Sequence, residues 1–72
     1  MAQLPEAPIN MARRHIREGA ERCARQCTLI ARMKAGEHDT AEAEHLLAQL
    51  EHFLALSRAH LARLLREAKE QS

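Results

Sequence analysis

The stretch Gly36-Glu37-His38-Asp39-Thr40 decides the fold of this 72-residue chain, because the sequence is typical of helix on both sides of it. A glycine such as Gly36 suits the left-handed residue that closes a helix. Asp39 or Thr40 can act as the N-cap of a second helix. With Asp39 as N-cap, Glu42 is the third helical residue and approximates a capping box. The sequence therefore predicts that the chain turns back on itself over residues 36–39.

The composition predicts helix throughout the rest of the chain. It is rich in Ala, Leu, Glu and Arg, and its one aromatic residue is Phe53. Residues of these types favour helix over strand. We expect a flexible N-terminal arm over residues 1–8, followed by a helical hairpin over residues 9–70, with helices at about 9–35 and 40–69. The fold class is all-α, a two-helix antiparallel hairpin.

Small and apolar side chains share one side of the first predicted helix, at about 100° per residue. This stripe contains Ile9, Ala12, Ile16, Gly19, Ala20, Cys23, Cys27, Ile30 and Ala31. Its small residues favour a close approach by a neighbouring helix. Gly19 inside a helix costs about 1 kcal/mol relative to alanine, and we expect close packing to compensate for that cost.

The second predicted helix carries a more regular pattern, in which apolar residues recur at alternating spacings of four and three. The pattern runs through Ala43, Leu47, Leu50, Leu54, Ser57, Leu61, Leu64 and Ala68. Such spacing is typical of the heptad seam of an antiparallel bundle. Leu46, Phe53 and Leu65 widen the seam, as expected for a helix with two neighbours.

Apolar residues also lie off the main stripe of each helix, on one flank. Leu29 and Met33, with Gln26, do so on the first helix, and Leu56 does so beside Phe53 and His60 on the second. Because one layer of two helices cannot cover both of its faces, we expect a second hairpin to complete a homodimeric four-helix bundle. A binding site for another helical protein would look the same. The expected interface residues are Ile16, Cys23, Leu29, Met33, Leu50, Phe53, Leu56 and Leu64.

Charge is distributed unevenly along the chain, although its formal net charge is only +1. Residues 9–36 carry a net charge of +5 and the remainder a net charge of −4. In an antiparallel pair the basic end of the first helix lies beside the acidic start of the second. A second hairpin placed head to tail would bring its acidic turn end against the basic open end. Exposed ion pairs contribute only about 0–1 kcal/mol each, so this pattern indicates orientation more than stability.

Several strings of the sequence resemble a group of short uncharacterised bacterial helical-hairpin proteins. They are His15-Ile16-x-Glu18-Gly19, Ala24-Arg25-Gln26, Gly36-x-x-Asp39-Thr40-Ala41-x-Ala43-Glu44-x-Leu46-Leu47 and Arg58-Ala59-His60-x-x-Arg63-Leu64-Leu65. The resemblance covers nearly the whole chain after the arm. It implies the hairpin, but it implies no activity and no functional residue.

The basic residues of the first helix suggest an alternative function. A hairpin dimer that grips structured RNA or DNA, as the ROP-type bundle does, would use them as phosphate contacts. The candidate residues are Arg13, Arg14, Arg17, Arg22 and Arg25. No aromatic residue on that side could stack on a base, and the total charge is nearly balanced. We therefore favour protein interaction over nucleic-acid binding.

Cys23 and Cys27 suggest a lesser alternative, because thiolates one helical turn apart in each of two facing copies could hold a soft metal or act in redox chemistry. Both cysteines lie on the predicted core stripe, where cysteine serves as a small apolar residue. His38, His45 and His52 recur every seven residues, a spacing of about 10 Å along a helix, which one metal ion cannot bridge. We therefore expect the two cysteines to pack in the core and the histidines to lie on a solvated face.

Neither catalysis nor a membrane location is predicted. No Ser or Cys has a recognisable base partner, and no glycine-rich loop could bind phosphate. No cofactor is expected. The chain has no apolar run of about 18 residues and no secretory signal pattern, so we expect a cytoplasmic protein.

Overall fold

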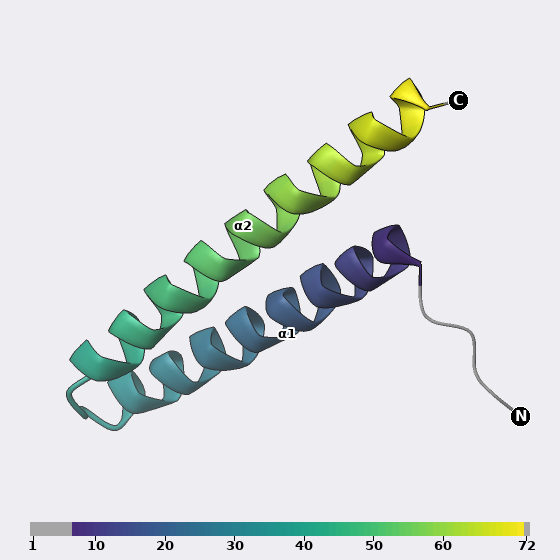
Figure 1. Cartoon of the computed structure of the whole chain (residues 1–72). Coiled ribbons are helices and arrows are strands. Elements are labelled where there is room, and N and C mark those ends of the chain that lie inside the picture. The colour runs from purple at the N-terminus through teal and green to yellow at the C-terminus, as the bar shows by residue number, and fades with distance from the viewer. Residues whose placement is uncertain (1–6, 72) are drawn as a thin grey trace, which may run out of the picture.

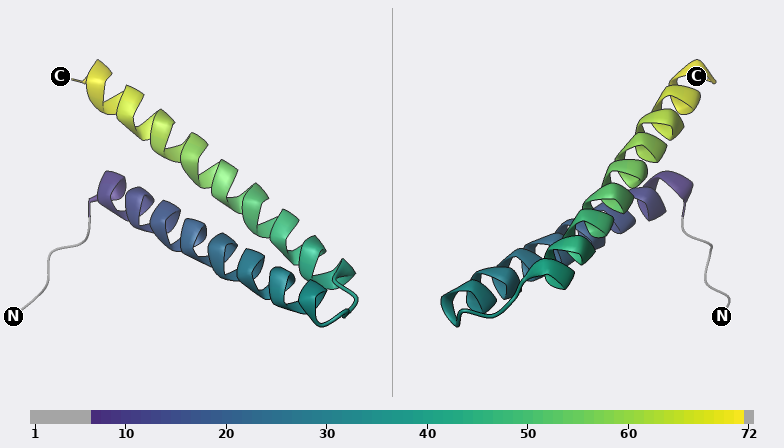
Figure 2. Two further views of the ribbon diagram at one scale, coloured as in Figure 1. Left: turned by 180° about the vertical axis from the view of Figure 1, so that it is seen from behind. Right: turned by 90° about the vertical axis from the view of Figure 1, so that its left-hand side faces the viewer.

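The computed structural model describes residues 7–71, which form two helices, α1 (Pro8–Ala35) and α2 (Ala41–Glu70). The helices run antiparallel and contact each other in a single layer (Figure 1), and the right-hand view in Figure 2 shows that they cross. This confirms the all-α antiparallel hairpin. α1 begins at Pro8, inside the span predicted as an arm; the rest of that arm, residues 1–6, lies outside the described residues. α2 begins and ends one residue later than expected.

Each helix contributes one row of side chains to the contact, and we call these rows the two seams. The α1 seam steps by three and four residues alternately through Ile9, Ala12, Ile16, Gly19, Cys23, Gln26, Ile30 and Met33, all buried or half-buried. The α2 seam runs through Ala43, Leu47, Leu50, Leu54, Ser57, Leu61 and Leu64, also buried or half-buried, as the heptad pattern predicts. Ala68, the predicted end of that row, is exposed.

The α1 seam differs from the predicted stripe at five residues. Ala20, assigned to the core stripe, is half-buried but outside the seam, and Met33, assigned to the flank, is half-buried within the seam. Cys27 and Ala31, assigned to the core stripe, are exposed. Gln26, assigned to the flank, instead faces α2, where its side-chain amide donates a hydrogen bond of 2.8 Å to the carbonyl oxygen of Ala43. The physical reason is that a helix with one neighbour buries only the narrow row repeating every three and four residues, so Gln26 rather than Cys27 follows Cys23.

The two seams are in close contact at Gly19. A Cβ atom placed on this residue would lie 3.3 Å from Cδ1 of Leu54, closer than ordinary van der Waals contact. Leu54 is one of three buried apolar residues among those described, together with Ala12 and Ile30. The close packing expected at the glycine inside α1 is therefore present.

α1 ends at Ala35, as expected, but the left-handed residue of the turn comes one position later than predicted. Gly36 has φ −88°, and the left-handed conformation falls on Glu37, with φ 61°. The N–H of Glu37 bonds to the carbonyl of Lys34, and the N–H of His38 bonds to that of Met33. This pair of bonds is a Schellman motif, which leaves Glu37 in the position that glycine would occupy without strain. The prediction that Gly36 is the left-handed residue was wrong.

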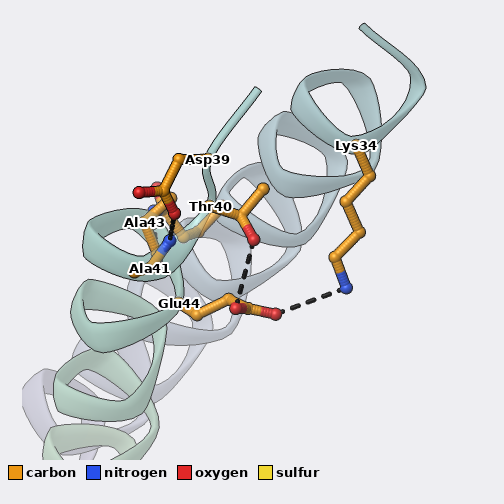
Figure 3. Close-up of polar contacts among 7 residues, drawn as sticks. Lys34, Asp39, Thr40, Ala41, Ala43 and Glu44 are labelled. Atoms are coloured by element: carbon orange, nitrogen blue, oxygen red, sulfur yellow. Dashed lines mark hydrogen bonds and ion pairs between the residues drawn. The ribbon is translucent and has the colours of Figure 1, made fainter. Parts of the chain in front are cut away.

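The start of α2 is held by the side chains of Asp39 and of Thr40, the N-cap residue (Figure 3). Asp39 accepts a hydrogen bond of 2.9 Å from the N–H of Ala41, and Thr40 donates one of 3.1 Å to the carboxylate of Glu44. Because α2 begins at Ala41, Glu42 is its second residue rather than its third. The predicted capping-box spacing between Asp39 and Glu42 is therefore displaced by one residue.

Glu44 also joins the two helices. Its carboxylate lies 3.3 Å from the ammonium of Lys34, in the last turn of α1. The basic end of α1 and the acidic start of α2 therefore meet at the turn, as the charge pattern predicts.

Candidate functional site

One side of the hairpin carries most of its large exposed apolar side chains. Leu29, Leu46 and Phe53 each directly precede a seam residue. In each case the next seam residue lies three positions further along the chain. In an antiparallel pair of helices, such positions border the same side of the seam. Leu56 lies one turn after Phe53, farther out on that side. We call these four residues the apolar face; their exposed fractions are 47% for Leu29, 45% for Leu46, 64% for Phe53 and 53% for Leu56.

The opposite side of the hairpin is different in character. Lys34 and Glu44, which form the ion pair between the helices, each follow a seam residue and therefore lie on this side. Leu65 also follows a seam residue, and it is 41% exposed. Leu65 is thus an exposed apolar residue that does not belong to the apolar face.

A groove of about 350 Å³ opens on the side of the apolar face, between α1 and α2. Its lining comprises His15, Glu18, Gly19 and Arg22 of α1, and Leu50, Phe53, Leu54 and Ser57 of α2. The absence of a side chain at Gly19 and the small side chain of Ser57 leave the space between the helices open. Leu50 and Leu54 make part of its lining apolar, and the exposed ring of Phe53 stands at its edge.

Charged side chains surround the apolar face. Leu29 shares a shallow hollow on α1 with Arg25 and Arg32. On α2, the guanidinium of Arg63 lies 2.9 Å from Nδ1 of His60 and 4.0 Å from the carboxylate of Glu67. Glu18, at the groove, lies 3.2 Å from Arg14 of its own helix. The apolar face is therefore bordered by residues that can form ion pairs with a partner.

The interface residues expected from the sequence fall into two groups. Ile16, Cys23, Met33, Leu50 and Leu64 are half-buried in the seams, between the two helices of the hairpin. Leu29, Phe53 and Leu56 are exposed on the apolar face. In the sequence pattern Phe53 and Leu65 widened the seam together with Leu46, and all three are exposed; Leu46 belongs to the apolar face. Its place directly before the seam residue Leu47 is the signal that indicates this.

The arginines considered for nucleic-acid binding spread around the outer side of α1. Arg13 follows the seam residue Ala12 and Arg22 precedes the seam residue Cys23, so these two lie on opposite sides of the hairpin. The other three lie on the outer positions between them, namely Arg14, Arg17 and Arg25. All are exposed except Arg14, which is half-buried.

The cysteines and histidines are not gathered at one place. Cys23 is half-buried in the α1 seam, and Cys27 is exposed on the side of Lys34. Within residues 7–71, no three side chains among His, Cys, Asp and Glu are grouped so that they could hold a metal ion. His52 lies on the outer side of α2, with its ring centroid 6.1 Å from that of Phe53.

Neither α1 nor α2 contains a stretch apolar enough to cross a lipid bilayer. Comparison of the chain with protein-family models, with curated proteins and with solved structures found no match.

Proposed function

We propose that this chain is a small non-catalytic interaction module that associates with a second copy of itself through the apolar face, forming a four-helix bundle. The observation that carries the proposal is the concentration of Leu29, Leu46, Phe53 and Leu56 on one side of a single-layer hairpin. Contiguous exposed apolar side chains rimmed by polar ones are typical of protein interaction sites.

The energetics of the hairpin support a second layer. Within residues 7–71 the buried apolar residues are Ala12, Ile30 and Leu54, and the remaining seam residues are half-buried. Apolar surface removed from water contributes about 25 cal/mol per Å². A chain of this length that buries so few side chains gains much of its stability from association.

A second copy of the chain is the occupant that fits this face. It brings an identical apolar face, and the two-fold pairing of identical patches is the commonest form of association among soluble proteins. It also brings both acidic and basic side chains at the edges of that face, so opposite charges can meet across the contact. Another amphipathic helix is the competing occupant.

Mass in solution tests the proposal. Light scattering on a sizing column, over a dilution series, should give twice the chain mass of 8.2 kDa for the wild type. Leu56→Glu should shift the protein towards monomer, because it places a carboxylate within the apolar contact. Leu65→Glu, the matched change on the opposite side, should leave the dimer intact. A wild type that is monomeric at every concentration would overturn self-association.

A different variant separates this proposal from nucleic-acid binding through α1. Changing Arg14 and Arg17 to Glu should leave the dimer intact, because both lie on the outer side of α1. If the wild type binds a structured RNA or a DNA duplex and the double variant does not, the α1 arginines carry a nucleic-acid function in addition.

A further inference from the structure

Phe53 and the groove beside it form a knob and a hole on the same surface. The Phe53 ring is 64% exposed, the largest exposed fraction among the large apolar residues described. The groove, of about 350 Å³, lies directly alongside it, over Gly19. Both features are near the midpoint of the hairpin, since α1 spans Pro8–Ala35 and α2 spans Ala41–Glu70. A two-fold axis through the centre of such a surface can place the protruding side chain of each copy in the groove of the other.

We infer that two copies pair head to tail, each inserting Phe53 into the groove over Gly19 of the other. This inference rests on the proposed self-association and specifies its geometry. The groove has room for a benzyl group, and Leu50 and Leu54 offer it apolar contacts. The two Phe53 rings would meet near the axis, where aromatic pairs add about 0.5–1.5 kcal/mol beyond burial. Buried aromatic anchors in pockets dominate the energetics of such interfaces.

Charges on α1 support the head-to-tail direction. In this pairing the two α1 helices lie antiparallel. Because Gly19 packs against Leu54, Phe53 and the axis lie at the level of Ala20. Glu18 precedes Ala20 by two residues and Arg22 follows it by two, so Glu18 of one copy comes opposite Arg22 of the other. Glu18 and Arg22 both line the groove, which places them within the contact.

Charges on α2 agree with the same axis. Phe53 lies at the level of the two-fold axis. Glu42 precedes Phe53 by eleven residues, and Arg63 follows it by ten. Glu42 of one copy therefore comes opposite Arg63 of the other. Each of the two pairings occurs twice across the axis. In the opposite arrangement, with both turns at one end, Glu18 would face Leu56 of the second copy and leave a carboxylate against an apolar side chain.

Charge reversal tests the contacts. Glu18→Arg and Arg22→Glu should each raise the dimer dissociation constant by about tenfold, because each creates a like-charge contact at two places. The double variant should return it to within a few fold of the wild-type value, since the exchanged charges again meet as opposites. Rescue separates this contact from a merely structural role for Glu18, which also pairs with Arg14. A double variant as weak as the single ones would overturn the head-to-tail pairing.

The direction of pairing can also be measured directly. A spin label on His38→Cys, in a background with Cys23→Ala and Cys27→Ala, reports the distance between the two turns of a dimer. At 1.5 Å per residue from Ala20 to the turn, head-to-tail pairing should separate the labels by about 50–55 Å. Pairing with both turns at one end should bring them within about 20 Å, which would overturn the inference and leave self-association standing. A monomeric wild type would overturn the proposed function itself.

Discussion

Gly19 and Leu54 are in close contact between the two helices, because a Cβ atom on residue 19 would lie 3.3 Å from Cδ1 of Leu54. Leu54 is 8% exposed, so its side chain has little room to move away. We expect Gly19→Leu to lower the free energy of unfolding by about 1–3 kcal/mol, as overpacking of a close contact does. Urea denaturation at one fixed protein concentration measures this change.

Ala24→Leu is the matched control for that prediction. It adds a similar side chain to the same helix, at an exposed position away from α2. It should change the free energy of unfolding by less than about 0.5 kcal/mol. Equal destabilisation by both variants would mean that contact with Leu54 is not what requires glycine at position 19.

Glu37 is the second position where a simple substitution should be informative. Its φ of 61° is left-handed, and this conformation costs a residue with a side chain about 1 kcal/mol or more. Glu37→Gly should therefore raise the free energy of unfolding by about 1 kcal/mol. Glu37→Ala should give no comparable gain, because alanine keeps the steric cost. Thermal unfolding of the three proteins at equal concentration distinguishes glycine's conformational freedom from the loss of the glutamate charge.

The hydrogen bond from Gln26 to the carbonyl oxygen of Ala43 gives a third prediction. Gln26→Ala should lower the free energy of unfolding by about 1 kcal/mol, through loss of that bond and of packing in the seam. Gln26→Leu should retain most of the stability, because leucine restores apolar contact and the carbonyl of Ala43 can still bond within α2. If the leucine variant is as unstable as the alanine variant, the hydrogen bond itself contributes most of the effect.

The Lys34–Glu44 ion pair should contribute little to stability. The two side chains are 61% and 51% exposed, so water and salt screen their attraction. A double-mutant cycle with Lys34→Ala and Glu44→Ala should give a coupling free energy below about 0.5 kcal/mol, decreasing in 1 M NaCl. Coupling above 1 kcal/mol that persists in high salt would show that the pair is more important than its exposure indicates.

The sequence predicted the hairpin because two kinds of local signal agree. The turn residues between Gly36 and Thr40 interrupt helix at one place, and the regular spacing from Ala43 to Leu64 identifies the seam of α2. The α1 seam was harder to predict, because its small residues surround the helix more evenly. Cys27 and Ala31 are as apolar as Gly19, and a polar residue such as Gln26 gives no sign in the sequence that a carbonyl of α2 will accept its hydrogen bond.

The candidate site was predicted in part for the same reason. Leu29, Phe53 and Leu56 stand off the main stripes, so the pattern of the sequence was enough to assign them to a flank. Leu46 and Met33 are equally apolar, yet Met33 is half-buried in the seam and Leu46 is exposed on the apolar face. The difference depends on which side of each helix meets the other. The helical periodicity of the sequence does not specify, to within one residue, which side of a helix faces its neighbour.

By itself the sequence determined the two helices and the position of the turn, since helix propensity, apolar spacing and capping residues act over only a few residues. The register of α1 against α2 was decided only by tertiary structure. That register brings Gly19 against Leu54 and places Phe53 at the edge of the groove. Each depends on how two surfaces pack, which combines residues far apart in the chain.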